Sequence, residues 1–280
     1  MSLRGKTIFI TGASRGIGLA IGLRAARDGA NIVVAAKSAV PHPKLPGTIY
    51  TAAAEIEAAG GRALPVVLDV RDEASVQTAV SSAVKRFGGI DICVNNASAI
   101  NLTGTLETDI KRYDLMHQIN GRGTFVVSRA CIAHLRKAAN PHVLAISPPL
   151  DFRPEWFAPF PAYATAKYNM SIYMMAMAEE FRRDGIAFNA LWPRTTVATS
   201  AVKFAIGDAS KFARSRKPAI MADAAYAIFN RPARECTGRF FIDDEVLSEE
   251  GVRDFSDYAL NPAEPLELDL FVDAAAPSPP

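Results

Sequence analysis

The chain has 280 residues, and its 31 lysines and arginines nearly balance its 29 aspartates and glutamates, leaving a formal net charge of +2. Hydrophobic residues make up 49% and charged residues 21%, which excludes a disordered chain, because disorder requires low hydrophobicity and high net charge. So small a charge also argues against a dedicated nucleic-acid-binding protein, since neutralising phosphates takes a concentrated basic surface. The length allows one large domain or two ordinary ones.

Cysteine and histidine are too sparse and too scattered to predict a disulfide framework or a metal site. No apolar run approaches the roughly 18 residues that a membrane span needs, and the N-terminus lacks the pattern of a signal peptide. We therefore expect a cytoplasmic protein in a reducing compartment, with no metal and no membrane span. The residues concerned are Cys93, Cys131, Cys236, His42, His117, His134 and His142.

Short apolar runs alternate with longer segments of helical periodicity along the chain. The runs mostly lack a strict apolar/polar alternation, which suits strands buried on both faces of a parallel sheet. The strand candidates are Thr7–Ile10, Ile32–Ala36, Ala63–Leu68, Ile90–Asn95, His142–Ser147, Ile186–Trp192 and Arg239–Ile242. Helical patterns between them include Gly18–Asp28, Ala74–Phe87, Arg122–Ala138 and Ala164–Arg183.

This β-then-α order predicts an α/β fold: a single-domain, Rossmann-type, doubly wound parallel sheet of about seven strands flanked by helices. No linker interrupts the middle of the chain. We expect the domain to span residues 1–272, because residues 273–280 are rich in alanine and proline and are typical of a disordered C-terminal tail.

A glycine-rich turn follows the first strand and opens the first helical segment. Glycines at this place permit a tight turn and a close approach of the backbone to a pyrophosphate, and the helix N-terminus offers free N–H groups to phosphates. The alternative is a structural turn that binds nothing. The predicted cofactor-binding residues here are Gly12, Ser14, Arg15, Gly16, Ile17 and Gly18.

Basic residues stand where the second strand ends. A site that prefers NAD would place an acidic residue there to hold the ribose 2′-hydroxyl, whereas this chain has Lys37, followed by His42 and Lys44. Together with Arg15, these cations suit the additional 2′-phosphate of NADP through charge-assisted hydrogen bonds. We therefore predict NADP, with NAD less favoured; the alternative is that the two lysines are solvated loop charges.

Tyr163 and Lys167 are spaced to share one face of a helix, because they are four residues apart. A free tyrosine has a pKa of about 10. A neighbouring ammonium, together with the positive nicotinamide of an oxidised cofactor, favours the phenolate and lowers that pKa. Tyr163 can then take a proton from an alcohol or return one to a ketone while hydride moves to or from the nicotinamide.

The Gly-x-x-x-Gly-x-Gly spacing, the Asn95-Asn96-Ala97-Ser98 segment and the Tyr-x-x-x-Lys pair together resemble the short-chain dehydrogenase/reductase family. The resemblance extends over about residues 1–245, and further segments up to about Leu270 resemble one subgroup of that family. It implies an enzyme that interconverts a secondary alcohol and a ketone, and a homodimer or homotetramer. It also assigns cofactor-lining positions to Asp69, Asn95, Ala97, Pro193, Thr195 and Thr196. For Asp69, capping of the following helix is a competing role.

The same resemblance assigns two further catalytic roles. Ser147 corresponds to the serine that hydrogen-bonds the substrate oxygen, although it precedes Tyr163 by sixteen residues, three more than is usual for the family. Asn120 corresponds to the asparagine that holds a water in a proton relay to the lysine. A structural role remains the alternative for both residues.

Substrate and partner are the least specified features. The aromatic residues Phe152, Trp156, Phe157 and Phe160 lie between Ser147 and Tyr163. They either wall a pocket for a lipophilic substrate or pack their loop onto the protein. The stretch Leu266–Val272 is a candidate for an arm exchanged between subunits. Two other functions stay open: a non-catalytic NADP-binding redox sensor or scaffold, and a 3-oxoacyl thioester reductase.

Overall fold

The computed structural model describes residues 2–43, 45–200, 202 and 209–273. Seven parallel strands form one sheet in the order β3-β2-β1-β4-β5-β6-β7. This confirms the predicted fold class. The strands are β1 (Thr7–Thr11), β2 (Asn31–Ala36), β3 (Arg62–Val67), β4 (Ile92–Asn95), β5 (His142–Ile146), β6 (Ala187–Trp192) and β7 (Phe240–Ile242).

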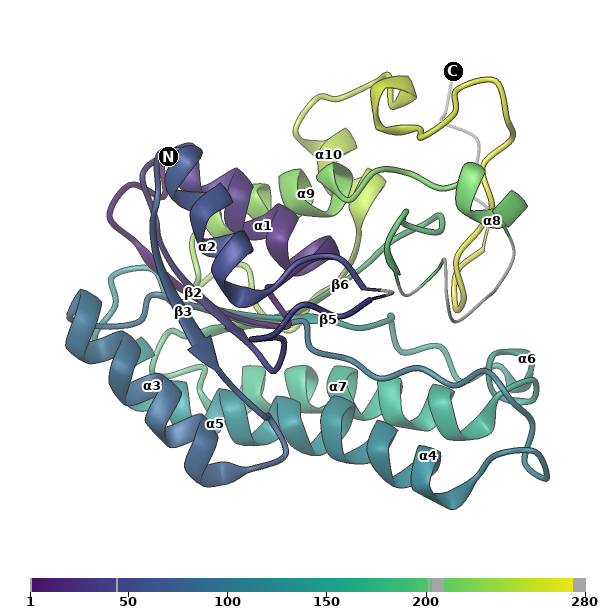
Figure 1. The fold of residues 1–280 in the computed structure, drawn as a ribbon, viewed down its shortest axis with the longest axis horizontal. Helices are drawn as coiled ribbons and strands as arrows, with labels where there is room; N and C mark the ends of the chain where they lie inside the picture. Colours follow the sequence, from purple (N-terminus) through teal and green to yellow (C-terminus); the bar gives the residue numbers. More distant parts are fainter. Residues whose placement is uncertain (1, 44, 201, 203–208, 274–280) are drawn as a thin grey trace.

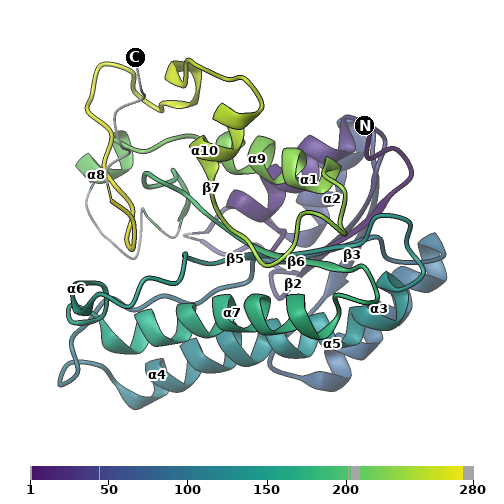
Figure 2. The same ribbon diagram turned by 180° about the vertical axis from the view of Figure 1, so that it is seen from behind.

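Helices cover both faces of the sheet (Figures 1 and 2). One face carries α1 (Gly16–Ala26), α2 (Ile49–Ala58), α9 (Ala219–Asn230) and α10 (Asp243–Glu249). The other carries α3 (Glu73–Phe87), α4 (Ile110–Met116), the π-helical turn η1 (His117–Arg122), α5 (Gly123–Leu135) and α7 (Pro161–Glu180). Short helices lie outside these layers: α6 (Pro154–Phe157), α8 (Ala209–Ala213) and η3 (Ser256–Tyr258).

The first strand shows why its sequence is apolar without alternation. Ile8 and Ile10 pack into the core on the side of α1, α2 and α9, while Phe9 between them packs into the core on the side of α3, α5 and α7. All three side chains are fully buried. A strand with helices on both faces must be apolar at consecutive positions, as the sequence predicted.

The predicted elements agree with the structure to within about three residues at each end. The helix expected at Arg122–Ala138 is the last part of a longer helical rod made of α4, η1 and α5. The Met-rich stretch lies in α7, where Met170, Met174 and Met177 are buried. Among the described residues no helix is both long and apolar enough to cross a bilayer. The predicted tail lies outside the described residues from 274 onward, whereas Asp273 belongs to the described part.

The topology places the site. Because all seven strands are parallel, their C-terminal ends meet at one edge of the sheet. The chain order reverses between β1 and β4, and ligands of open α/β sheets bind in the crevice outside the strand ends at such a switch point. The segments that follow β1, β2, β3, β4, β5 and β6 all begin at this edge, and these segments contain most of the residues that the sequence singles out.

Candidate active site

The loop between β1 and α1 has the geometry of a phosphate-binding turn. Gly12 and Gly16 have φ angles of 67° and 60°, in the left-handed region where a side chain is disfavoured. Gly18 has no such strain but no room either, because a Cβ there would lie 2.5 Å from Nδ2 of Asn96 and 2.9 Å from the Gly12 oxygen. The glycines at 12 and 18 therefore let the loop pack closely against the end of β4.

Two residues that the sequence analysis did not select hold this loop to β4. Asn96 donates from Nδ2 to the carbonyl oxygens of Thr11 and Gly12, at 2.9 and 3.2 Å. In return, Oγ1 of Thr11 accepts hydrogen bonds from the backbone N–H groups of Asn96 and Ala97, both at 3.0 Å. The paired asparagines of the Asn95-Asn96 segment were the available signal for this contact.

Cations lie around the ends of β2 and β3, but they are already partnered. Nζ of Lys37 lies 3.2 Å from the carboxylate of Asp69, which Arg71 also binds at 2.7 Å. The hydrogen bonds from Arg71 hold the pKa of Asp69 well below its usual range. Asp72, not Asp69, caps α3, so the structure removes the capping alternative for Asp69.

The other predicted cations have separate places. Arg15 donates to the carbonyl oxygens of Pro46 and Gly47, at 2.8 and 2.7 Å, and so ties the glycine loop to the segment after β2. His42 is exposed in that segment, and Lys44 lies outside the described residues.

The backbone after β4 is held by the side chain of Asn120. Asn120 clamps the backbone of Ala99, accepting from its N–H at 2.8 Å and donating to its carbonyl at 3.0 Å. Asn120 lies in η1, a π-helical turn, a conformation often found at functional sites. Asn95 points inward and donates to Ser128 at 2.9 Å, while its buried Oδ1 has no hydrogen-bond partner within the described structure.

Tyr163 and Lys167 lie one turn apart on α7 and are both buried, with exposed fractions of 4% and 3%. Lys167 donates to the carbonyl oxygen of Ile146 at 2.7 Å, and its Nζ lies 5.0 Å from the Trp192 ring centre. Burial lowers the pKa of Lys167 to about 7. Burial, followed by the charge of Asp269, raises the pKa of Tyr163. The expected lowering of the tyrosine pKa is thus not found in this closed arrangement, because desolvation disfavours both charged groups.

Ser147 has an unexpected partner. Its Oγ receives a hydrogen bond from Oγ of Ser171 at 3.0 Å, and Ser171 also interacts with the Pro148 oxygen at 2.6 Å. Ser171 lies on α7, one turn beyond Lys167. The serine after β5 is therefore held against α7, in spite of the longer connection to Tyr163.

The two threonines after β6 differ in their hydrogen bonding. Oγ1 of Thr196 shares a hydrogen bond with Ser215 at 2.8 Å, whereas Oγ1 of Thr195 is buried and has no partner among the described residues. Pro193 precedes them. Arg194 occupies the position at which the family has glycine and binds Asp244 at 2.9 Å.

The C-terminal segment Glu267–Asp273 lies over this site, which the sequence analysis did not foresee. It runs beside the turn after β6, where Leu268 pairs with Thr195 in an antiparallel bridge. In Figure 2 this yellow segment descends toward the end of the molecule that carries α6. The stretch Leu266–Val272, considered above as an arm exchanged between subunits, packs against the turn after β6. Phe271 is the sole described non-glycine residue with a positive φ, 67°.

The aromatic residues before Tyr163 lie in different surroundings. Phe157 and Phe160 pack with the buried cluster that contains Tyr163. Trp156 also contacts that cluster but donates from Nε1 to Asp151 at 2.9 Å, which fixes its own loop. Phe152 is 68% exposed.

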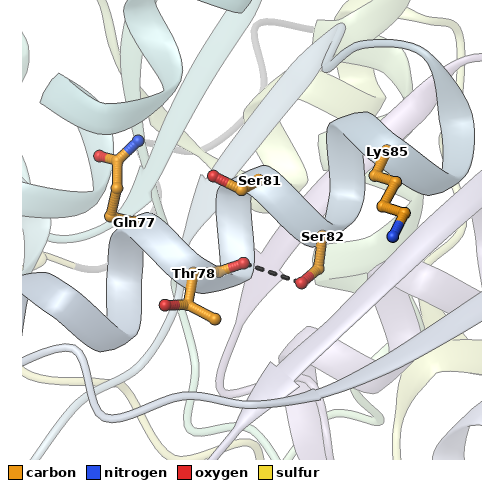
Figure 3. Close-up of a pocket in the computed structure, with 5 residues that line it drawn as sticks. All are labelled: Gln77, Thr78, Ser81, Ser82 and Lys85. Carbon is orange, nitrogen blue, oxygen red and sulfur yellow. Dashed lines mark hydrogen bonds between the residues drawn. The ribbon is translucent and has the colours of Figure 1, made fainter.

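A separate hollow lies on α3, lined by Gln77, Thr78, Ser81, Ser82 and Lys85 (Figure 3). The hydroxyl of Ser82 donates to the Thr78 carbonyl at 2.8 Å, so it bonds within its own helix. A single helix lines this hollow, and it brings no groups from different elements together. Among the described residues no cluster of histidine, cysteine and carboxylate side chains is arranged to hold a metal ion.

The glycine turn, the seven-stranded sheet and the Tyr-x-x-x-Lys pair define a class. A family model described as short chain dehydrogenase matches residues 6–206. The chain belongs to this family and is an oxidoreductase of the short-chain dehydrogenase/reductase class, whose members use nicotinamide cofactors. The family predicted from the sequence is confirmed.

Particular relatives are similar over nearly the whole chain. Hydroxysteroid dehydrogenase-like protein 2 from Danio rerio is 60% identical over 271 residues, which cover 97% of this chain and 65% of the relative. The chain therefore spans less than two thirds of that relative's length. A crystal structure of a short chain dehydrogenase from Mycobacterium thermoresistibile is 55% identical with a TM-score of 0.93, covering 99% of this chain and 98% of the other.

More distant structures contain different cofactors. An NADH-dependent reductase complexed with NAD is 27% identical, with a TM-score of 0.69, and covers 86% of this chain and 95% of its own. A metagenomic short-chain oxidoreductase in complex with NADP is 23% identical, with a TM-score of 0.70, over 86% of this chain and 98% of its own. These likenesses leave the choice between the two cofactors open.

Proposed function

We propose that the protein is an NADP(H)-dependent oxidoreductase that interconverts a secondary alcohol and a ketone on a lipophilic substrate. The observation that carries the proposal is the placement of Tyr163 and Lys167 on one face of α7, at the sheet edge where the glycine turn begins α1. A phenol beside an ammonium group, next to a dinucleotide-binding turn, supplies proton transfer where hydride transfer can occur.

The residues present fit a nicotinamide dinucleotide. The Gly12–Gly18 turn holds Gly12 and Gly16 in the left-handed region and leads into the N-terminus of α1, as the pyrophosphate-binding turn of a dinucleotide fold does. At the other end, the buried and unpartnered Oγ1 of Thr195 suits the carboxamide of the nicotinamide. Because the hydroxyl of Thr196 is already hydrogen-bonded to Ser215, we assign the carboxamide contact to Thr195.

The chain's own residues handle the proton and the substrate oxygen. When bound, the reduced cofactor supplies a hydride to the carbonyl carbon. Tyr163 donates its phenolic proton to the carbonyl oxygen, and in the reverse reaction it accepts the alcohol proton. Lys167 stabilises the phenolate and binds the cofactor ribose, and Ser147 orients the substrate oxygen. Asn120 supports the relay by fixing the loop at Ala99.

Basic residues support NADP over NAD. Lys37 stands directly after β2, the position at which an acid would bind the 2′-hydroxyl of NAD, and its side chain is 60% exposed. Arg71, which the sequence analysis did not include, adds a second cation at the same carboxylate. A 2′-phosphate placed here would replace Asp69 as the anionic partner of Lys37, with a comparable charge-assisted bond.

Two remaining expectations belong to the same proposal. Exposed apolar side chains on α5 and α7, Phe125, Ile172 and Met175, support a homodimer or homotetramer formed through these helices. The three free, buried cysteines are compatible with a reducing compartment such as the cytoplasm.

The experiment measures NADPH oxidation with a panel of steroid, aliphatic and acyl-CoA ketones. Because the name of the Danio rerio relative refers to hydroxysteroids, steroid ketones are tested first. We expect Tyr163→Phe to lose at least 100-fold in kcat while its affinity for NADPH is kept. Selective turnover of the acyl-CoA ketones would favour the thioester reductase. NADPH binding without turnover of any ketone would favour the redox sensor or scaffold, and full activity of Tyr163→Phe would refute the mechanism.

A further inference from the structure

The catalytic groups are closed off from solvent. Tyr163, Lys167 and Ser147 are exposed by only 4%, 3% and 0%. A ketone must come within hydrogen-bond distance of the tyrosine hydroxyl to be protonated. Some part of the chain must therefore leave this position before a substrate can react.

Phe271 is the side chain that covers the tyrosine. Its ring stacks on that of Tyr163, with 6.2 Å between ring centres and 27° between planes. Three other rings surround it: Phe160 at 5.8 Å, Tyr168 at 5.5 Å and Trp192 at 5.9 Å. Phe271 is 1% exposed and ranks among the largest fully buried side chains. The phenyl ring thus fills an aromatic chamber whose wall includes the proton donor.

The segment that carries Phe271 is held along its length by a few backbone contacts. Nε1 of Trp192 donates to the Leu270 oxygen at 2.8 Å, and the N–H of Asp269 donates to the Arg194 oxygen at 3.0 Å. These bonds align the segment with the turn after β6, as a bound peptide would be aligned with a host strand.

The two ends of the segment are fixed by ion pairs near the surface. Glu267 binds Lys211 at 3.0 Å and Arg214 at 2.7 Å. At the other end, Asp273, whose side chain is 66% exposed, binds Arg153 at 2.6 Å. The exposed Asp273–Arg153 pair contributes little and weakens in salt, whereas the Glu267 pairs are half-buried. Release of the segment therefore requires its C-terminal pair and its hydrogen bonds to the turn after β6 to open together.

We propose that Glu267–Asp273 is an internal ligand of the substrate pocket, and that Phe271 occupies the subsite for a flat, apolar group of the substrate. This inference rests on the proposed function, because it takes Tyr163 as the reacting group. It deepens that function by naming the substrate class: ketones or alcohols that carry an aryl ring or a similarly flat apolar ring next to the reacting carbon. Substrate and Phe271 compete for the same chamber.

The probe that separates this inference from the proposed function is benzyl alcohol, an aryl alcohol whose binding needs neither cofactor nor turnover. Trp192 reports on it, because its indole lines the chamber, and a Trp156→Phe background removes the other tryptophan. In that background, we expect Phe271→Ala to bind benzyl alcohol at least tenfold more tightly than the parent chain. Leu268→Ala is the matched control, since Leu268 lies on the same segment but is 44% exposed, and it should leave the affinity unchanged.

A second measurement uses the unaltered chain and so does not depend on the folding of a variant. Hydrogen exchange of residues 267–273 should rise when benzyl alcohol saturates the protein, and should rise again in high salt. Equal affinities of the parent chain and Phe271→Ala, or a segment that stays protected at saturation, would overturn the inference. If the probe binds as expected but no ketone is reduced, the proposed function fails while the internal ligand stands.

Discussion

Asn96 holds the glycine turn by donating from its side-chain amide to the carbonyl oxygen of Thr11 at 2.9 Å. The same nitrogen lies 2.5 Å from the place that a Cβ on Gly18 would take. The absence of a side chain at Gly18 is therefore what allows the turn after β1 and the end of β4 to be joined.

The first prediction concerns this contact. We expect Gly18→Ala to displace Asn96, loosen the turn and raise the Kd for NADPH at least tenfold, a loss of about 1.4 kcal/mol of binding free energy. Gly89→Ala is the control, because no atom lies within 4 Å of its added Cβ. Calorimetric titration of both variants measures the difference. Equal affinities would show that the turn does not depend on the packing at Gly18.

The second prediction concerns cofactor choice. Lys37→Ala should raise the Kd for NADPH at least tenfold, since a charge-assisted hydrogen bond contributes roughly 1.5–3 kcal/mol, and should leave the Kd for NADH nearly unchanged. Lys85→Ala, on the outer face of α3, is the control for a general loss of positive charge. A similar loss for both cofactors would mean that Lys37 does not bind the 2′-phosphate.

The third prediction is a pH dependence of alcohol oxidation. Burial, with a smaller contribution from Asp243, raises the pKa of Asp269 to about 7, so that Asp269 carries its charge only above that pH. The charge raises the pKa of Tyr163. In Asp269→Asn the phenolate should form at lower pH, and the rising limb of kcat/KM should begin earlier. This ratio reports the free enzyme, in which the segment is closed.

The control for that profile is Asp254→Asn, at an exposed position away from the site. Below pH 7 the profiles of Asp269→Asn and the unaltered enzyme should coincide, because the carboxyl is then neutral in the latter. A constant ratio of the two rates at every pH would point to a packing effect instead of a charge effect.

The fourth prediction concerns stability and His142. This buried residue lies at the start of β5 with Nε2 3.1 Å from the Arg231 oxygen, and burial lowers its pKa to about 4. The unfolded chain, with a pKa of about 6.5, binds the proton first, so the free energy of unfolding falls as the pH drops from about 6.5 to about 4. The full loss is about 3 kcal/mol.

Urea unfolding of His142→Asn at several pH values tests this point. The variant should lose most of the pH dependence in that interval, although it will be less stable at neutral pH. His134→Asn, which changes a less deeply buried histidine, should keep most of it. An unaltered slope in His142→Asn would assign the acid sensitivity to other groups.

Local sequence patterns were sufficient for the sheet, the glycine turn and the Tyr163–Lys167 spacing, because each of these depends on neighbours a few residues apart. The partners of the site residues were not predictable in this way. Lys37 meets Asp69 across two strand ends, and Phe271 reaches Tyr163 from 108 residues further along the chain. Such contacts are set by how the elements pack.

The side chain of Asn120 shows another feature that sequence patterns could not predict. Its family role was assigned from its place in the sequence, but the π-helical turn that aims it at Ala99 has no periodicity that distinguishes it from the surrounding α-helix. The Asn95-Asn96 pair did contain a signal. The structure shows that the second asparagine, not the first, binds the glycine turn.

The positive φ of Phe271 has an energetic consequence for the closed segment. Left-handed backbone at a residue with a side chain costs roughly 1–2 kcal/mol, while burying a phenylalanine side chain contributes about 1.5–3 kcal/mol. The two amounts nearly cancel at this one residue, so closing the segment gains little net free energy from the ring that fills the chamber. A modestly favourable ligand is then enough to shift the population toward the open form.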